Sequence, residues 1–164
     1  MIAGNQISAF VITYNEEENI AECLDTLNWA DEIVIVDSYS TDSTREIASR
    51  YTNRIIKREF GGHVNQTRFA SEQVSYPWVV WLDADERLTP EAIDQLHKVF
   101  QKDTIQKYKA FAFPRKAFFM DRWIMHSGWY PQPKIRLWHR DYGQIEGDEP
   151  PPHVEIKEGL NEKI

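Results

Sequence analysis

Short apolar runs alternate with stretches of helical spacing along the first hundred residues. Each run has the length of a buried strand, and the predicted strands are 7–13, 32–37, 54–58 and 78–82. Apolar residues at helical spacing predict helices after them, at 16–27, 45–51, 64–74 and 91–100. This alternation indicates an α/β fold with a mostly parallel central sheet flanked by helices.

The second part of the chain has a weaker pattern. Segments 109–115 and 134–139 are predicted strands, whereas 118–133 is aromatic and fits neither period. The prolines at 150–152 exclude a helix or a central strand there. At 164 residues the chain is expected to be one domain covering 1–164, and no obvious element closes it at its end.

The strand predicted at 78–82 runs directly into three acids, Asp83, Asp85 and Glu86. Open α/β sheets bind ligands at the carboxyl ends of their strands, so these acids are expected in a ligand crevice. In an extended chain Asp83 and Asp85 would point to the same side, where carboxylate oxygens suit Mg²⁺ or Mn²⁺ carrying a diphosphate. The alternative is a solvated acidic turn that leads into the next helix.

The strand predicted at 32–37 also ends in an acid. If it neighbours 78–82, Asp37 shares the crevice with Asp83 and can accept a hydrogen bond from a nucleobase or a ribose hydroxyl. An acid in this position is otherwise a cap. The chain has neither a dinucleotide-binding glycine motif nor a phosphate-binding Gly-Lys-Ser/Thr loop. The phosphates would then be neutralised by a metal, and a nucleotidyltransferase is disfavoured.

Charge and composition narrow the classes of partner. The formal net charge of −7 argues against a nucleic-acid partner. Segment 109–140 is basic and aromatic, which suggests an anionic partner, a membrane face or a sugar-bearing acceptor, or else a solvated strand edge over core aromatics. The single cysteine, Cys23, excludes an internal disulfide and favours a reduced compartment. No apolar run has the length of a membrane span.

Three motifs resemble the signature series of family 2 glycosyltransferases. They are Thr13-Tyr14-Asn15-Glu16-Glu17, Val36-Asp37-Ser38-Tyr39-Ser40-Thr41-Asp42-Ser43-Thr44 and Trp81-Leu82-Asp83-Ala84-Asp85-Glu86. Segments 126–131 and 134–138 resemble a narrower branch, the bacterial lipopolysaccharide core β-1,4-glucosyltransferases. The resemblance implies a Rossmann-like, A-type glycosyltransferase fold and an inverting transfer. Residues 7–100 would be the nucleotide-sugar-binding half, and 101–164 the acceptor-side half.

The resemblance also implies roles for individual residues. The expected donor-binding residues are Thr13, Tyr14, Glu16, Asp37, Asn65, Arg68 and Asp83. Asp85, with Asp83 beside it, is the expected ligand of Mg²⁺ or Mn²⁺ on the diphosphate, and Glu86 is expected to lead the next helix. The expected acceptor-binding residues are His126, Trp129, Tyr130 and Arg136.

An inverting transfer also needs a base that takes the proton of the acceptor hydroxyl. The narrower branch carries a His-Glu pair after the strand at 134–138. Here His153 and Glu155 align just beyond that position, and prolines stand in its place. Asp148, Glu149 and Glu155 are therefore the candidate bases, and Glu149 is favoured because the proline run would fix its backbone at the crevice rim. The alternative is a solvated acidic loop.

Together these observations predict a metal-dependent inverting glycosyltransferase. It would move a hexose, with glucose favoured, from a UDP-sugar to a hydroxyl of an envelope glycan such as lipopolysaccharide core. The expected partners are the UDP-sugar and a glycan or glycolipid acceptor, and the expected location is the cytoplasm, with peripheral contact at the inner membrane. The alternative is a non-catalytic nucleotide-sugar-binding or scaffold domain. Relatives of this kind carry a longer helical tail, so a truncated or short form is expected.

Overall fold

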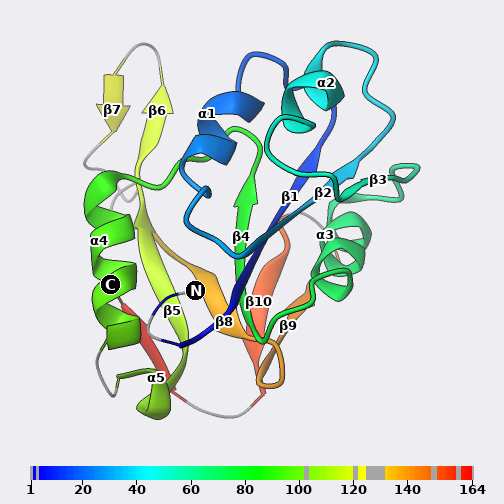
Figure 1. Cartoon of the computed structure of the whole chain (residues 1–164). Helices are drawn as coiled ribbons and strands as arrows, with labels where there is room; N and C mark the ends of the chain where they lie inside the picture. Colours follow the sequence, from blue (N-terminus) through cyan, green and yellow to red (C-terminus); the bar gives the residue numbers. More distant parts are fainter. Residues whose placement is uncertain are drawn as a thin grey trace.

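A seven-stranded sheet forms the centre of the molecule, with the spatial order β11-β5-β8-β4-β1-β2-β3 (Figure 1). The computed structural model describes residues 2, 4–101, 104–119, 122–124, 132–148, 151–157 and 160–163. The strands of the sheet are β1 (Ile7–Thr13), β2 (Glu32–Asp37), β3 (Ile55–Lys57), β4 (Trp78–Asp83), β5 (Tyr108–Arg115), β8 (Gln132–His139) and β11 (Leu160–Lys163). Two hairpins stand outside it, β6 (Ala117–Phe119) with β7 (Arg122–Ile124), and β9 (Gly143–Glu146) with β10 (His153–Ile156).

The sheet is mostly parallel, as the alternating pattern predicts. β1 pairs in parallel with β2 on one side and β4 on the other, and β3 continues the parallel order beyond β2. β8 is antiparallel to both β4 and β5, and β11 is parallel to β5. Among the described strands of this sheet, only β8 runs against the others. All seven residues of β1 are buried, which is typical of a parallel strand covered on both faces.

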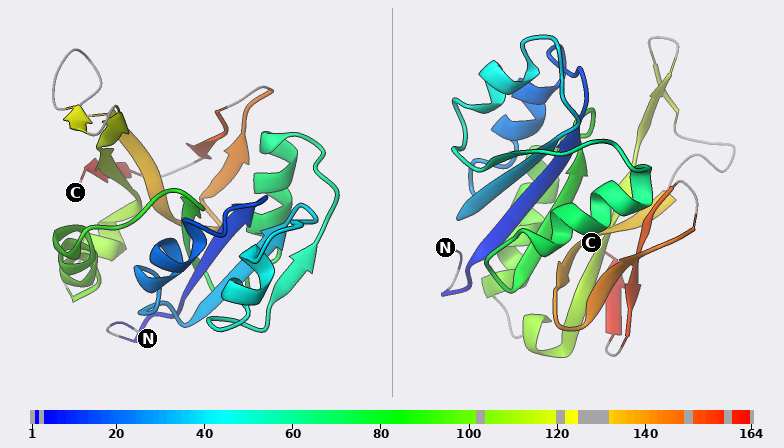
Figure 2. Two further views of the ribbon diagram at one scale, coloured as in Figure 1. Left: turned by 90° about the horizontal axis from the view of Figure 1, so that it is seen from above. Right: turned by 90° about the vertical axis from the view of Figure 1, so that its right-hand side faces the viewer.

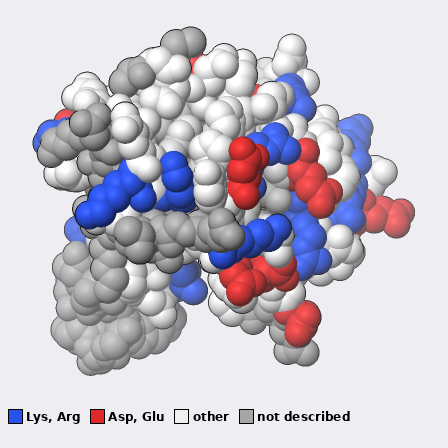
Figure 3. Space-filling view, turned by 90° about the horizontal axis from the view of Figure 1, so that it is seen from below, with Lys and Arg blue, Asp and Glu red and all other residues white. Residues whose placement is uncertain are grey.

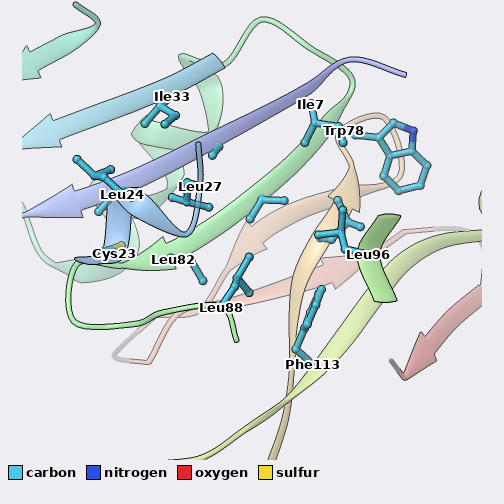
Figure 4. Close-up of a cluster of buried hydrophobic side chains, with 14 of the residues drawn as sticks. Ile7, Cys23, Leu24, Leu27, Ile33, Trp78, Leu82, Leu88, Leu96 and Phe113 are labelled. Atoms are coloured by element: carbon cyan, nitrogen blue, oxygen red, sulfur yellow. The ribbon is translucent and has the colours of Figure 1, made fainter. Parts of the chain in front are cut away.

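Helices cover both faces of the sheet (Figure 2). They are α1 (Ile20–Asp25), α2 (Thr44–Ala48), α3 (His63–Glu72), α4 (Pro90–Gln101) and α5 (Thr104–Lys107). On one face Leu24 of α1 and Leu96 of α4 join a cluster with Ile7 (Figure 4), and each fully buried leucine contributes about 2 kcal/mol. On the other face α3 and the β9–β10 hairpin lie side by side, and Ala70 and Ile145 belong to a second cluster.

The structure differs from the sequence prediction mainly in short elements. Helix α1 begins at Ile20 rather than at Glu16, and no side chain caps it. The strands β9, β10 and β11 are not predicted because each has only four residues and no long apolar run. The pairing of β11 is tertiary, since β11 joins β5 from a distant part of the sequence. The unassigned segment 118–133 contains parts of the β6–β7 hairpin and the start of β8.

A polar network ties the strands together at the edge where β1 begins. Glu32 forms an ion pair with Arg54, and one of its oxygens accepts a hydrogen bond from the Ser75 backbone at 2.8 Å. Arg54 also donates to the Gln73 carbonyl at 2.8 Å. Seen from this side, acidic and basic side chains are intermingled on the surface (Figure 3). Among the described residues, no helix combines the length and apolarity of a membrane span.

Candidate functional site

The three sequence motifs meet at the carboxyl edge of the sheet, which faces the viewer in the left panel of Figure 2. From β1 the chain passes to β2 on one side, and it later returns to place β4 on the other side of β1. In open α/β sheets this change of direction leaves a crevice outside the strand ends, where ligands bind. The register places Thr13 beside Asp37, and Ile12 beside Asp83.

The loops after β1 and β2 brace each other through hydrogen bonds. Asn15 accepts from the Thr41 backbone N–H at 2.8 Å, and its own N–H donates to Ser40 Oγ at 2.9 Å. The backbone N–H of Glu16 donates to Thr44 Oγ1 at 2.8 Å. Residues of the first motif therefore hold residues of the second, and the two loops form one rigid rim.

Two tyrosines project from this rim. Tyr14 is 58% exposed and Tyr39 is 53% exposed, although both are large and apolar. Tyr39 has a φ of 61°, and within the described part of the chain it shares a positive φ among non-glycine residues only with Asn15. Asparagine adopts this conformation readily, whereas a bulky residue rarely does. A strained residue with an exposed ring suggests that the ring serves a ligand rather than the core.

The buried side chain of Asp37 stabilises the rim through hydrogen bonds. It is completely buried, and its two carboxylate oxygens accept hydrogen bonds from the backbone N–H and the hydroxyl of Ser40. Arg45 Nε lies 3.6 Å from Asp37 Oδ2. In this structure Asp37 therefore fixes the loop that carries Tyr39, and the expected direct contact with the nucleotide stays a prediction.

The placement of the other acids corrects two sequence arguments. Asp83 is the last residue of β4, and the Glu86 N–H donates to its carbonyl at 2.9 Å, so a turn follows. Asp85 lies exposed in that turn and not on an extended strand, which removes the period-two reason for a shared side. Asp83 and Asp37 are also separated by β1. By strand alternation Asp83 belongs with the α3 face and Asp37 with the α1 face.

Arg136 of β8 is bound to the acids at the end of β4. Its side chain is only 8% exposed, and Nη2 lies 2.7 Å from Glu86 Oε1 and 3.3 Å from Asp83 Oδ2. The guanidinium carbon sits 4.1 Å from the centre of the Trp81 ring, in cation–π geometry. The sequence predicts Arg136 as an acceptor-binding residue, whereas in the structure its guanidinium pairs with Glu86 and Asp83. Glu86 lies in the segment between β4 and α4, which begins at Pro90, and its carboxylate pairs with Arg136.

Burial changes the proton affinity of two groups beneath this edge. It raises the pKa of Asp83 above the usual carboxyl range, and the Glu86 carboxylate acts in the same direction while Arg136 opposes it. Burial also raises the pKa of the Cys23 thiol to about 12. The Cys23 thiol lies 3.5 Å from the Asp83 carbonyl and is completely buried.

The two residues of α3 that are predicted to bind the sugar donor form hydrogen bonds with other residues of the protein. Asn65 accepts from Arg58 Nη2 at 3.0 Å, and Arg68 donates to the Ile145 carbonyl of β9 at 3.2 Å. The sequence prediction missed Gln66, which is fully buried and donates to Ser38 Oγ at 3.1 Å. Gln66 thus anchors α3 to the loop after β2. A glutamine within a helical pattern gives no signal of such a role.

The two remaining predicted donor residues lie at the foot of the rim. Thr13 is 6% exposed, and its hydroxyl has no hydrogen-bond partner among the described residues. Glu16 accepts a hydrogen bond from Asn19 Nδ2 at 2.8 Å. The Thr13 hydroxyl is thus a buried polar group to which the described residues supply no hydrogen-bond partner.

Two of the three candidate bases, Asp148 and Glu155, lie within the described residues. Asp148 is exposed in the segment that follows β9. Glu155 is exposed on β10, where its neighbour Val154 faces the core, so Glu155 lies on the outer side of the hairpin. This side is unfavourable for a base that must reach the crevice. Glu149 and the acceptor residues His126, Trp129 and Tyr130 lie outside the described residues.

The carboxylates at the end of β4 are suitable ligands for a divalent cation that also binds the phosphate oxygens of a diphosphate. Asp83 is 39% exposed and Asp85 is exposed, and carboxylate oxygens suit Mg²⁺ and Mn²⁺. Among the described residues no group of three or more His, Cys, Asp or Glu side chains could enclose a metal. The protein therefore offers one or two ligands, and phosphate oxygens would supply others.

Two cavities lie away from the motifs. One of about 360 Å³ lies between α3 and β9 and is lined in part by Arg68 and Trp138. The other, of about 430 Å³, lies near the edge where β1 begins and includes Glu32 and Arg54. Neither is lined by a residue of the three motifs.

The chain is similar to known glycosyltransferases. The family model described as glycosyl transferase family 2 matches residues 8–155. An uncharacterized glycosyltransferase of Rickettsia typhi is 36% identical over 107 residues, which cover 65% of this chain and 37% of that protein. The lipopolysaccharide core biosynthesis glycosyltransferase LpsC of Rhizobium meliloti is 42% identical over 93 residues, covering 54% of this chain and 34% of LpsC.

A solved structure shows the same fold. The crystal structure of Staphylococcus aureus TarS 1-349 is 25% identical, with a TM-score of 0.55, over 68% of this chain and 36% of that one. The chain spans roughly a third of the length of the curated relatives described above. The family match includes all three motifs and most of the described sheet. The chain belongs to glycosyl transferase family 2.

Proposed function

We propose that the chain carries the nucleotide-sugar-binding part of an inverting glycosyltransferase of the cell envelope. The observation that carries the proposal is the convergence of the three motifs of a family 2 domain at one sheet edge. There, two exposed tyrosines stand over β1 and β2, and two carboxylates stand at the end of β4. The named relatives support an envelope role, since LpsC is a lipopolysaccharide core enzyme and TarS a poly(ribitol-phosphate) β-N-acetylglucosaminyltransferase.

The donor would lie across the edge, from β2 to β4. Adjacent strands are about 4.8 Å apart, so β2 and β4 are separated by about 10 Å, a distance that a nucleoside diphosphate can span. Tyr14 and Tyr39 offer ring faces to the base, and Thr13 offers a free hydroxyl. Asp85 and Asp83 would hold the divalent cation at the diphosphate end.

The chemistry then needs charge stabilisation and a base. A bound Mg²⁺ or Mn²⁺ would stabilise the negative charge that develops on the departing UDP. The acceptor hydroxyl attacks the anomeric carbon from the opposite face and must lose its proton. Asp148 is the described candidate for that proton, because Glu155 faces outward. Glu149 stays a candidate from the sequence.

The acceptor would approach from the side of β5 and β8. Arg115 and Lys116 are exposed there, at the end of β5, and provide positive charge for an anionic glycan or glycolipid. Glucose as the transferred hexose, lipopolysaccharide core as the acceptor, and a peripheral place at the cytoplasmic face of the inner membrane are parts of this proposal.

A turnover assay tests the proposal. TarS has been crystallised with UDP and with UDP-GlcNAc, so UDP-sugars are the donors to examine first. The chain is incubated with UDP-glucose or UDP-GlcNAc, Mn²⁺ and lipopolysaccharide core, and released UDP is measured. The expected result is acceptor-dependent release that falls at least a hundredfold in an Asp148→Asn variant or a Glu149→Gln variant. Absence of release with every donor would contradict catalysis.

A second candidate function is nucleotide-sugar binding without turnover. It is favoured by the departure at 150–152, where prolines occupy the place of the His-Glu pair. This function predicts UDP binding with no UDP release. Substitutions at Asp148 and Glu149 would then leave every measured property of the chain unchanged.

A further inference from the structure

The buried guanidinium of Arg136 is paired with the acids at the end of β4. The Arg136 side chain is 8% exposed and contacts two carboxylates, at 2.7 Å for Glu86 and 3.3 Å for Asp83. A cation held this deeply is stable only when it is paired, and Arg136 is paired on two sides. A divalent ion at the same acids must therefore share Asp83 with a guanidinium.

Glu86 is the stronger partner in this arrangement. Its Oε1 receives the shorter bond from Arg136, and its Oε2 accepts the backbone N–H of Asp83 at 3.3 Å. Glu86 thus holds both the arginine and the start of the turn that carries Asp85. The Trp81 ring lies 4.1 Å from the guanidinium carbon and fixes its plane. The contact to Asp83 is the longer of the two ion pairs that Arg136 makes.

We infer that Arg136 and Glu86 are positioning residues that set the divalent-cation affinity of the site in opposite directions. Arg136 is a built-in counter-ion that competes with the metal for Asp83. Glu86 draws Arg136 toward itself and leaves Asp83 partly free. The inference rests on the proposed function, because it concerns the cation that would accompany the donor diphosphate.

The signs of the two effects follow from charge and geometry. Without Arg136, Asp83 and Glu86 face the site with no internal cation, so Mn²⁺ should bind more tightly. Without the Glu86 charge, Arg136 keeps only Asp83 as an anionic partner, so Mn²⁺ should bind more weakly. Groups that orient metal ligands from behind commonly change metal affinity by on the order of tenfold, which sets the size expected here.

Mn²⁺ binding to the whole chain tests the inference. The ion is titrated in the presence of saturating UDP, and free Mn²⁺ is followed by electron paramagnetic resonance. The variants are Arg136→Met, which keeps an apolar stem against Trp81, and Glu86→Gln, which keeps the shape of the side chain. The matched control is Arg115→Met, because Arg115 lies 3.9 Å from Glu86 but is 47% exposed. Its effect should stay below twofold.

The expected result is about tenfold tighter Mn²⁺ binding in Arg136→Met and about tenfold weaker binding in Glu86→Gln. If Arg136→Met unfolds, the double variant Arg136→Met/Glu86→Gln replaces the buried pair by neutral groups of similar size. It should bind Mn²⁺ at least as tightly as the wild type. Unchanged affinities, the opposite signs, or an equal effect of Arg115→Met would overturn the inference. A wild-type chain that binds neither UDP nor Mn²⁺ would instead overturn the proposed function.

Discussion

Replacing Tyr39 separately by glycine and by alanine distinguishes the stability cost of its left-handed backbone from the effect of losing its ring. Both variants lose the ring, but only alanine keeps a Cβ at the φ of 61°. The left-handed conformation costs a residue with a Cβ about 1–2 kcal/mol, and the larger unfolded-state entropy of glycine offsets about 0.4–1 kcal/mol of this. Tyr39→Gly should therefore be more stable than Tyr39→Ala by about 1 kcal/mol. In a domain of this size that corresponds to about 2–4 °C in melting temperature.

The same pair of variants tests the role of the ring. If the exposed ring of Tyr39 contacts the base, both variants should bind UDP with about fivefold lower affinity, since one aromatic contact contributes about 1 kcal/mol. Stability is measured by urea denaturation and affinity by calorimetric titration of UDP. Equal stability of the glycine and alanine variants would refute an imposed left-handed backbone. Wild-type affinity in both would refute the contact with the base.

Three further predictions concern the acids and the thiol. Asp85→Asn should weaken UDP binding in the presence of Mn²⁺ by at least tenfold. The control Asp94→Asn, on the exposed side of α4, should leave this affinity unchanged, and calorimetry compares the two variants. Asp37→Asn should lower the free energy of unfolding by about 1–3 kcal/mol in urea, because the two donors of Ser40 bind different carboxylate oxygens and the amide nitrogen that replaces one of them cannot accept a hydrogen bond; an unchanged value would argue against it. The Cys23 thiol should resist a disulfide reagent at pH 8 in the folded protein and react after unfolding, since burial raises its pKa to about 12. Fast labelling of the folded chain would contradict this.

The central strands are predictable from the sequence because their apolar runs are buried on both faces. β1, β2 and β4 fall where the runs place them, and the acids at the ends of β2 and β4 lie at the expected edge. The orientation of the acids is not predictable in the same way. The period of two holds only in an extended chain, and β4 ends at Asp83, so the turn decides where Asp85 lies.

The contacts of Arg136 depend on tertiary structure. β8 enters the sheet antiparallel between β4 and β5, and this pairing brings Arg136 over Trp81 and onto Glu86. No local pattern near Arg136 or Glu86 signals a partner about fifty residues away. The hairpin β9–β10 presents the same difficulty, because its short strands gain their burial from α3 and the sheet.

Calorimetric titration of UDP into the whole chain, with and without Mn²⁺, tests most directly whether the carboxyl edge is a nucleotide-sugar site. The expected result is binding at one site in the micromolar to millimolar range that is typical of enzyme substrates. Binding should be strongest with Mn²⁺ and should weaken by at least tenfold in an Asp85→Asn variant that unfolds at the same urea concentration as the wild type. No detectable binding of UDP in the presence of Mn²⁺ would contradict the proposed function.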